Sequence, residues 1–417
     1  MNQIADPSSF DPAPSGTAAG SKHHHPGLVL LALAIGGFAI GTTEFAAMSL
    51  VPYFAPDLGI GATTAGHVIS AYALGVVVGA PVIAVLAARM ARRTLLVLLM
   101  LLFAVGNGLS ALAPTYGFLV AFRFLAGLPH GAYFGVAALV AASLVPRERR
   151  SQAVSRVLAG LTVATMVGVP LANLIGQFIG WRWSFGFAAL LALLTATLVR
   201  LYAPYGAPLK GASPLRELGA LRRGQVWLTL ATGAIGFGGM FAVYTYLAST
   251  LLEVTHAPPS MIPVMLTVFG FGMTIGNLAC AWAADRGVMR AAGATLVWSA
   301  AALALYPFAT GNVWTLALVV FLIGCGGGLG TILQTRLMDV AEDAQTLAAA
   351  LNHSAFNTAN ALGPWLAGLA LSAGFGFPAT GWVGAALALA GLVIWGVSVV
   401  TDRPRRAEQR MSQSRAA

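Results

Sequence analysis

Residues 94–113 read TLLVLLMLLFAVGNGLSALA, a run without a charged side chain. An α-helix rises about 1.5 Å per residue, so about 20 such residues cross the apolar layer of a bilayer, which is about 30 Å thick. Runs of similar length and composition recur along the whole chain, at 27–50, 66–88, 117–142, 155–178, 183–202, 227–250, 262–284, 290–309, 314–338, 346–372 and 378–400. We therefore predict an all-α membrane protein with twelve transmembrane helices.

The composition excludes a soluble globular protein. Hydrophobic residues make up 58% of the 417 residues and charged residues only 9%, whereas soluble domains carry about 25% charged residues because their surfaces face water. The net charge of +10 comes from short basic clusters between apolar runs, which is typical of cytoplasmic loops and not of a nucleic-acid groove. Cys280 and Cys325 lie inside apolar segments, so we predict neither a disulfide nor a metal site.

A polar break divides the chain into two halves. Residues 203–226 combine prolines with basic residues, and we expect them to form a cytoplasmic linker between six-helix bundles at 27–202 and 227–400. Similar short basic segments follow the second and eighth runs, which indicates a weak internal repeat, as in some transporters. Residues 1–26, rich in Pro, Ser, Ala and Gly, predict a disordered cytoplasmic tail, and residues 401–417 a basic cytoplasmic tail.

The distribution of Lys and Arg predicts the orientation in the membrane. If the twelve runs are spans, all of the 23 Lys and Arg residues except Arg123 and Arg182 fall on one side. The positive-inside rule makes that side cytoplasmic. We therefore expect a multi-pass protein of the cell inner membrane with both termini in the cytoplasm.

Two ionisable residues lie at similar depth inside the predicted spans, away from the basic side. They are Glu44, late in the first run, and Arg123, early in the fourth. Charges in the apolar layer are costly and usually functional. Burial favours a neutral carboxyl group and a nearby Arg favours the carboxylate, so solute binding could shift this balance and exchange a proton. The alternatives are a static ion pair, or a Glu44 close enough to the interface to stay hydrated.

A third candidate lies on the same helical face as Arg123. Arg123, Gly127, His130 and Phe134 follow one another at a spacing that places them on one side of a helix. Pro129 is expected to bend that helix. The imidazole of His130 could relay protons near neutral pH, or it could be a neutral hydrogen-bond partner between helices.

Polar and aromatic residues of the seventh and eleventh runs predict a substrate cavity. The candidates are Phe241, Tyr244, His353, Asn357 and Asn360. Aromatic rings and amides together suit amphipathic or weakly polar solutes. For the aromatic residues, ordinary packing between helices is the alternative, whereas the two amides would be costly if they faced lipid.

The fifth run carries small residues at intervals that allow close helix packing. Gly160, Gly168 and Gly176 are separated by multiples of four residues, and Pro170 lies among them. Small residues at this spacing let two helices approach closely. The proline is expected to loosen the backbone.

These motifs resemble the major facilitator superfamily over residues 27–400. The stretch 160–176 is similar to the helix 5 motif of its drug:proton antiporters, although Asn173 and Leu174 replace small residues. The stretch 123–127, RFLAG, resembles the helix 4 motif, whose Arg is implicated in proton coupling. The stretches 42–45, TTEF, and 131–135, GAYFG, resemble the bacterial branch of sugar-efflux and chloramphenicol-resistance-type exporters.

The segment between the second and third helices departs from the family pattern. Ala84, Ala88 and Ala91 stand where the family has Gly, Asp and Gly. The resemblance implies a cytoplasmic gate, and its candidate residues are Arg89, Arg92, Arg93, Asp285 and Arg286. Only the second half keeps the acidic partner, so we expect Asp285 to matter more than the 84–91 segment.

The resemblance implies a secondary active transporter that exports small molecules, such as drugs, sugars or metabolites, in exchange for protons by alternating access. A proton- or cation-coupled importer is the alternative, and a transporter-like receptor is a third possibility from another class. We expect a monomer in the lipid bilayer, with no cofactor besides protons as the coupling ion and no nucleic-acid partner. The sequence shows no nucleophile–base pair or phosphate loop, so an enzyme is not expected.

Overall fold

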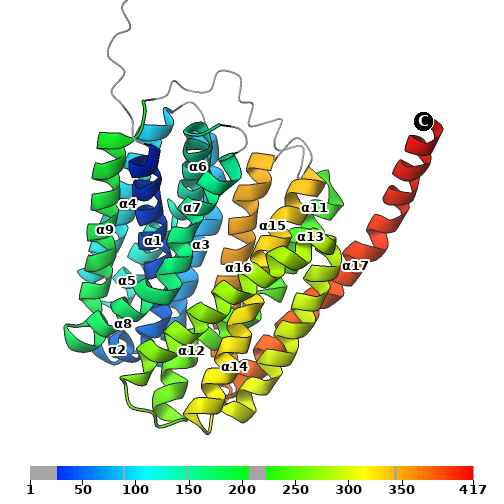
Figure 1. Cartoon of the computed structure of the whole chain (residues 1–417). Coiled ribbons are helices and arrows are strands. Elements are labelled where there is room, and N and C mark those ends of the chain that lie inside the picture. Colours follow the sequence, from blue (N-terminus) through cyan, green and yellow to red (C-terminus); the bar gives the residue numbers. More distant parts are fainter. Residues whose placement is uncertain (1–25, 88–89, 147–148, 206–221, 342–344, 417) are drawn as a thin grey trace, which may run out of the picture.

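The computed structural model describes residues 26–87, 90–146, 149–205, 222–341 and 345–416 (Figure 1). Every regular element in these ranges is helical. The disordered tail predicted at 1–26 lies almost entirely outside the described residues, as does most of the predicted linker.

The first half begins with a long helix and ends at Tyr202. Its elements are α1 (Pro26–Ser49), α2 (Val51–Asp57), α3 (Ala62–Leu86), α4 (Arg92–Ala111), α5 (Tyr116–Gly127), α6 (His130–Ser143), α7 (Arg150–Val163), the π-helical turn η2 (Ala164–Gly168), α8 (Val169–Phe178) and α9 (Trp181–Tyr202). The pairs α5–α6 and α7–α8 each make one interrupted span, because 116–143 and 152–178 are each a single helical stretch long and apolar enough to cross a membrane. The short helix α2 has no counterpart in the sequence-based prediction.

The second half begins at Gly224. Its elements are α11 (Gly224–Gly236), α12 (Gly238–Glu253), α13 (Met261–Ala309), α14 (Val313–Cys325), the 3-10 turn η4 (Gly326–Gly328), α15 (Leu329–Ala341), α16 (Gln345–Ser372) and α17 (Ala379–Ala416). The backbone of α17 stays helical through most of the predicted C-terminal tail and extends beyond the bundle (Figure 1).

The helix α13 is two spans joined by a sharp turn. Gly287 has φ 155° and ψ 100°, far from helical values. Cys280 and Thr295 lie on opposite sides of this turn, yet their Sγ and Oγ1 atoms are 3.4 Å apart. In a straight helix these residues would be about 22 Å apart. The segments 261–286 and 288–309 therefore form an antiparallel hairpin.

The described helices confirm the predicted fold. Ten helical stretches are long and apolar enough to cross a membrane. One of these ten stretches is α13, whose hairpin makes two spans. The 28-residue α16 adds another, although its Asn and His residues lower its hydropathy. Twelve spans in two six-helix halves result.

Four spans are interrupted. One break is the turn at Phe237 between α11 and α12; the other three lie where the sequence itself disfavours an ideal α-helix. Pro129 separates α5 from α6, because proline has no amide hydrogen for the helical ladder. Pro170 follows the π turn of η2 for the same reason. Three consecutive glycines form η4 between α14 and α15, in the span of the second half that corresponds to α5–α6. The interruption of both corresponding spans agrees with the predicted repeat.

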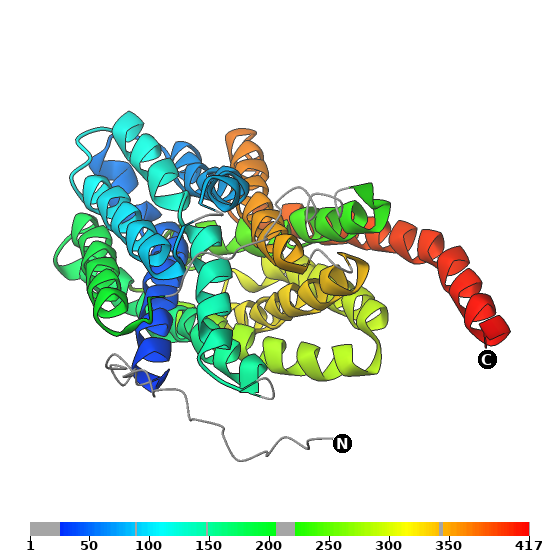
Figure 2. The same cartoon turned by 90° about the horizontal axis from the view of Figure 1, so that it is seen from above.

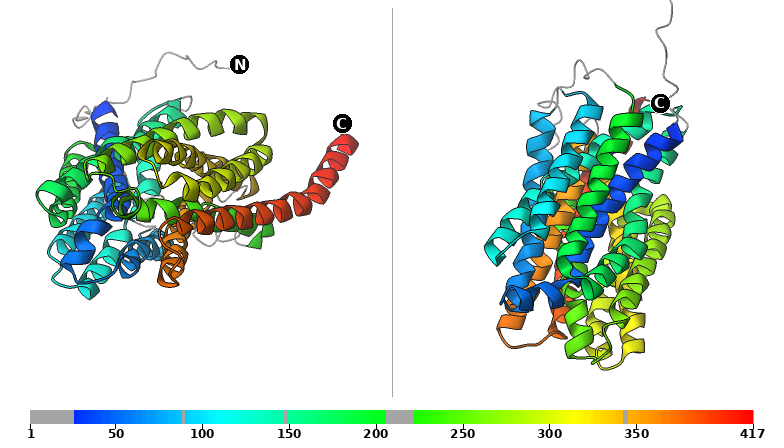
Figure 3. Two further views of the ribbon diagram at one scale, coloured as in Figure 1. Left: turned by 90° about the horizontal axis from the view of Figure 1, so that it is seen from below. Right: turned by 90° about the vertical axis from the view of Figure 1, so that its left-hand side faces the viewer.

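The two halves lie side by side (Figure 2), and α3 of the first half packs along α16 of the second. We call the end of the bundle where α1 begins the upper face, and the end where α1 meets α2 the lower face (Figure 3). Several polar contacts join the halves between the middle and the lower face. Ser70 Oγ donates to the Ala361 carbonyl at 3.0 Å, and Gln177 Nε2 donates to the Pro259 carbonyl at 3.0 Å.

Candidate functional site

Glu44 lies at the contact between the two halves. Glu44 is only 7% exposed and lies in the lower part of α1. The Oε1 atom accepts a hydrogen bond of 3.2 Å from Asn360 Nδ2 on α16. The buried carboxyl group therefore bridges α1 of the first half and α16 of the second half, and these two helices must separate if the halves move apart at the lower face.

Arg123 is completely buried on α5 and is surrounded by polar partners of its own half. Its Nη1 donates to Asn107 Oδ1 at 3.2 Å, and its Nη2 donates to the Thr43 carbonyl at 3.5 Å. Thr43 Oγ1 also donates to Asn107 Oδ1, at 2.9 Å. The guanidinium carbon lies 4.3 Å from the centre of the Tyr72 ring, within the range of a cation–π interaction.

Glu44 and Arg123 do not form the direct ion pair that their matched depth suggested. Glu44 contacts Asn360 of the other half, whereas the guanidinium of Arg123 turns toward Asn107 and Tyr72. The two groups are neighbours through Thr43, which precedes Glu44 in α1 and accepts from Arg123. The charge of Arg123 therefore acts on Glu44 through space and through the α1 backbone.

His130 lies at the start of α6, next to the bend at Pro129. Its Nδ1 atom is 3.1 Å from the Tyr72 hydroxyl. The centre of its ring is 6.1 Å from that of His353, which belongs to α16. His353 stacks on Phe134 with a ring separation of 5.3 Å and an interplanar angle of 5°. The two histidines thus form a second contact between the halves, above the Glu44–Asn360 contact.

The predicted cavity residues gather around the same interface, and several of their polar atoms have no protein partner. Phe45 packs against Phe241 and Tyr244, with ring separations of 5.9 and 5.6 Å. The buried Tyr244 hydroxyl and the side-chain oxygens of Asn357 and Asn360 have no hydrogen-bond partner. Unpaired buried acceptors cost about 1–3 kcal/mol each, so a solute with hydrogen-bond donors could satisfy them when the halves open.

The three glycines of the fifth span face α1. A Cβ atom on Gly160 would lie 2.1 Å from the Ala34 carbonyl oxygen, and one on Gly168 would lie 2.1 Å from Thr42 Oγ1. The corresponding Cβ on Gly176 would lie 2.3 Å from a methyl group of Leu50. Helix α1, which carries Glu44, is therefore held against the fifth span at a distance that only glycine permits.

The predicted gate residues are spread over the upper face. Arg89 lies outside the described residues, and Arg92 begins α4. The guanidinium of Arg93 donates to the Arg200 carbonyl. Asp285 is exposed, while Arg286 donates to the carbonyl of Trp282 at 2.9 Å and lies 3.5 Å above the Trp282 ring. The described contacts of Arg286 are thus with its own helix and not with the first half.

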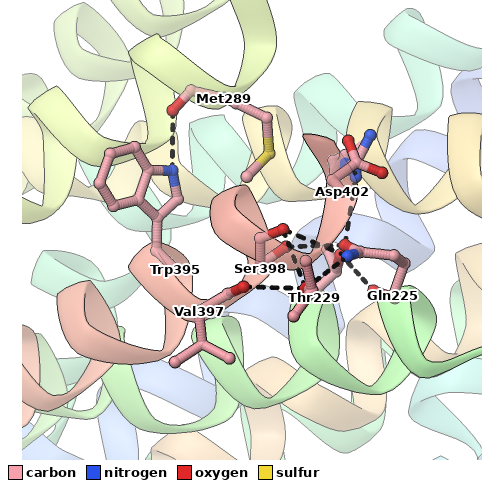
Figure 4. A network of polar contacts seen from close by, with 9 residues as sticks. Gln225, Thr229, Met289, Trp395, Val397, Ser398 and Asp402 are labelled. Carbon is pink, nitrogen blue, oxygen red and sulfur yellow. Dashed lines mark hydrogen bonds and ion pairs between the residues drawn. The ribbon is translucent and has the colours of Figure 1, made fainter. Parts of the chain in front are cut away.

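A polar network near the upper face of the second half was not predicted (Figure 4). Arg336 of α15 is 5% exposed, and its Nη2 pairs with Asp402 Oδ2 at 2.9 Å and donates to Gln225 Oε1 at 3.2 Å. Gln225 also accepts from Ser398 Oγ at 2.8 Å, and Trp395 Nε1 donates to the Met289 carbonyl at 2.8 Å. These contacts fasten α17 to α11, α13 and α15. In the sequence, Arg336 is one more cation on the basic side, at the end of the run 314–338, and nothing in that position signals a buried network.

Arg182, one of the two cations outside the basic side, has a partner at the lower face. It pairs with Asp57 at the end of α2, and Trp181 Nε1 donates to the same carboxylate at 3.0 Å. The hydrogen bond from Arg182 is the main reason why the pKa of Asp57 is lowered from 3.8, with Trp181 as the second cause. The pair fixes α2 to the beginning of α9.

Comparisons with known proteins agree with this architecture. Residues 33–253 and 240–416 match the family model described as Major Facilitator Superfamily. The chain is 41% identical to the inner membrane transport protein YdhP of Escherichia coli K12 over 366 residues, which cover 86% of this chain and 94% of that protein.

Two further relatives have names that describe efflux or resistance. A chloramphenicol resistance protein of Streptomyces lividans is 36% identical over 351 residues, 82% of this chain and 89% of its own length. A probable sugar efflux transporter of Pasteurella multocida is 30% identical over 368 residues, 88% of this chain and 91% of its own length.

Among solved structures, a bacterial homolog of the human lysosomal transporter Spinster, in an inward-facing and unoccupied conformation, superimposes with a TM-score of 0.63. The match covers 91% of this chain and 96% of that one at 18% identity. At this level of identity, the likeness extends to the fold.

Proposed function

Since this chain belongs to the major facilitator superfamily of membrane transporters, we propose that it is a secondary active transporter that exports small molecules in exchange for protons. The names of two relatives, one a chloramphenicol resistance protein and one a probable sugar efflux transporter, support export over import. Neutral or weakly polar solutes of similar kind are the expected substrates.

One observation carries the proposal of proton coupling: the buried carboxyl group of Glu44 lies at the contact between the halves and bonds Asn360 across it. An ionised carboxylate accepts from the amide nitrogen. A protonated carboxyl group can also donate, and the Asn360 side-chain oxygen has no other donor. Proton binding would therefore remove a buried charge while keeping a hydrogen bond between the halves.

Arg123 supplies the opposing influence. An arginine guanidinium stays protonated in proteins. That of Arg123 donates to the carbonyl of Thr43, the residue before Glu44. A fixed positive charge favours the carboxylate, whereas burial against the second half favours the neutral form. Opening of the halves would hydrate Glu44 and change this balance, which links proton release to the conformational change.

The residues around this contact are the proposed solute site. Phe241 and Tyr244 supply aromatic surface, and His353, Asn357 and Asn360 supply hydrogen-bonding groups on one helix. Such a lining suits a solute with an apolar body and a few donors. In the proposed cycle, the solute occupies the interface in the conformation in which the unpaired side-chain oxygens become accessible.

The proposal is tested by transport in inside-out membrane vesicles. We expect uptake of radiolabelled chloramphenicol or arabinose, as representatives of the two named solute classes, to increase when the vesicle interior is made acidic. Glu44→Gln keeps the shape of the side chain but cannot titrate, so it should remove the dependence on the pH gradient. Glu253→Gln changes an exposed glutamate at the lower face and serves as the matched control.

Two results would contradict the proposal. Uptake of these and other screened solutes that ignores an imposed pH gradient would exclude proton antiport. Gradient-driven uptake that is the same in Glu44→Gln as in the wild type would exclude Glu44 as the coupling group, and His130 would then be the next candidate.

We further propose that the upper face is cytoplasmic and the membrane is the inner membrane, as for the relative in Escherichia coli named above. Support comes from the basic residues that lie at helix ends of the upper face, such as Arg92, Arg200 and Arg223. Single cysteines placed at the exposed connections near Gly311 and Gly374 should react with an impermeant reagent from outside the cell. Labelling only from the cytoplasm would reverse the orientation.

A further inference from the structure

We propose that Tyr72 connects the charge of Arg123 to the His130–His353 contact between the halves, so that proton binding at the histidines is coupled to the position of the halves. The inference rests on the proposed proton coupling, because it assigns a route between two parts of the same site. Tyr72 acts here as a positioning residue: it is expected to set the state of His130 and is not expected to touch the solute.

Tyr72 contacts both polar groups of the first half. It lies on α3, is 1% exposed, and presents its ring face to the guanidinium of Arg123 at 4.3 Å. Its hydroxyl is 3.1 Å from His130 Nδ1. On one side of Tyr72, Arg123 hydrogen-bonds Asn107 and the carbonyl of Thr43, the neighbour of Glu44. On the other side, the ring of His130 faces that of His353. Among the described contacts, Tyr72 is the side chain that bridges these two clusters.

The contact beyond Tyr72 crosses from one half to the other. His130 belongs to α6 and His353 to α16, with ring centres 6.1 Å apart. Two imidazolium charges at this distance would repel strongly in a buried site. A second proton on this pair is therefore harder to bind when the halves are together than when they are apart, which is the requirement for proton binding to bias the conformational equilibrium.

Tyr72 determines how easily His130 can take that proton. The positive charge over its ring face favours a phenol that donates its hydrogen, so the O–H is expected to point to His130 Nδ1 and to keep that nitrogen unprotonated. When a proton binds Nδ1, the hydrogen bond must reverse: Nδ1–H becomes the donor and the phenol oxygen the acceptor, beside a cation. Removing the hydroxyl removes this opposition.

Other titratable groups surround the pair at greater distance. Helices α1, α3, α4, α7 and α16 all pack against α6. Apart from His130, the titratable or charged residues of these helices, of α5 and of α6 itself are Glu44, His67, Tyr72, Arg92, Arg93, Tyr116, Arg123, Tyr133, Arg150, Arg156 and His353. Of these, only Tyr72 and His353 make a described hydrogen-bond or ring contact with His130.

The experiment measures the distance between the halves as a function of pH, without any solute. Spin labels are attached to cysteines introduced at Ser143 of α6 and Asp339 of α15, both exposed near the upper face, after Cys280 and Cys325 have been replaced by alanine. The full chain is studied in nanodiscs between about pH 5 and 9. In the wild type we expect the distance distribution to change with a single pH midpoint.

Tyr72→Phe keeps the ring under Arg123 and removes the hydroxyl. A net hydrogen bond contributes about 0.5–1.5 kcal/mol and one pH unit corresponds to about 1.4 kcal/mol, so the midpoint should rise by about 0.4–1 pH unit. Tyr133→Phe is the matched control, because Tyr133 is also fully buried on the same helix as His130 and its hydroxyl donates to the Leu33 carbonyl at 2.8 Å. It should leave the midpoint unchanged.

His353→Gln tests the other end of the route at a half-buried position and should weaken or abolish the pH response. A wild-type distance that ignores pH would overturn the inference, as would a midpoint that Tyr72→Phe and Tyr133→Phe move equally, or a response that His353→Gln leaves intact. These outcomes are independent of the vesicle assay. A pH-driven distance change in a protein that shows no gradient-driven transport would contradict the proposed antiport but not the role of Tyr72.

Discussion

Replacement of Asn107 by leucine should destabilise the protein, because Asn107 hydrogen-bonds the buried guanidinium of Arg123. The Asn107 side-chain oxygen accepts from Arg123 Nη1 at 3.2 Å and from Thr43 Oγ1 at 2.9 Å, and the residue is fully buried. Leucine has a similar volume but no acceptor. A hydrogen bond to a charged group contributes about 1.5–3 kcal/mol and a neutral one about 0.5–1.5 kcal/mol, so the loss should be about 2–4 kcal/mol.

Asn173→Leu is the matched control for this prediction. Asn173 is a buried amide of the same half, but it bonds only neutral groups, the Ser49 carbonyl at 3.0 Å and Gln177 at 2.7 Å. Its replacement should cost about 1–2 kcal/mol. Thermal unfolding can be followed by labelling of the buried Cys280 with a thiol-reactive dye, and Asn107→Leu should lower the midpoint by about 5–10 °C, clearly more than Asn173→Leu.

A double-mutant cycle makes the test specific to the cation. If Arg123 is held mainly by Asn107, the effects of Asn107→Leu and Arg123→Leu should be coupled by about 1.5 kcal/mol or more. Equal losses in Asn107→Leu and Asn173→Leu, or a coupling below about 0.5 kcal/mol, would refute the reasoning that this amide stabilises the buried charge.

Three further predictions concern packing and charge elsewhere. Gly168→Val should prevent close packing of the fifth span on α1 and abolish a monodisperse protein in size-exclusion chromatography, whereas Gly186→Val, where a Cβ meets nothing within 4 Å, should be tolerated. Arg336→Met removes one partner of a mostly buried ion pair and should cost about 3–5 kcal/mol, seen as a lower unfolding midpoint in the same thiol assay. An unchanged midpoint would show that the network of Figure 4 is not stabilising. Because Arg182 lowers the pKa of Asp57, their pair stabilises the fold above about pH 4 and loses this contribution as the pH falls below that value. Asp57→Asn should therefore flatten the pH dependence of the free energy of unfolding in that range. The change should be less than about 1 kcal/mol, since both side chains are about half exposed.

The membrane-spanning segments were predictable because each is a property of its own sequence. The run 94–113 became α4 (Arg92–Ala111) and the run 183–202 became α9 (Trp181–Tyr202). Apolar length and flanking charge decide insertion locally, without reference to the neighbouring helices. The short helix α2 was missed for the same reason: at seven residues, with two prolines, it has no periodicity to detect.

The partners inside the site could not be predicted from the sequence. Matched depth placed Glu44 and Arg123 at one level, but depth does not determine which way a helix is rotated. The rotation turned Arg123 to Asn107 and Tyr72, and Glu44 to Asn360. A signal for Asn107 existed, since it is the only carboxamide in its apolar run; Tyr72 gave none, because a tyrosine in a span is usually part of the packing.

The turn at Gly287 has a consequence for biosynthesis. A single residue with a positive φ joins two spans, so the growing chain has no extended loop on which the first span could settle in the bilayer before the second emerges. The two should leave the insertion machinery together, as a preformed pair. A bulkier residue at Gly287 should then increase the fraction of chains that are misinserted or degraded during synthesis. The molecules that do mature should transport at the normal rate.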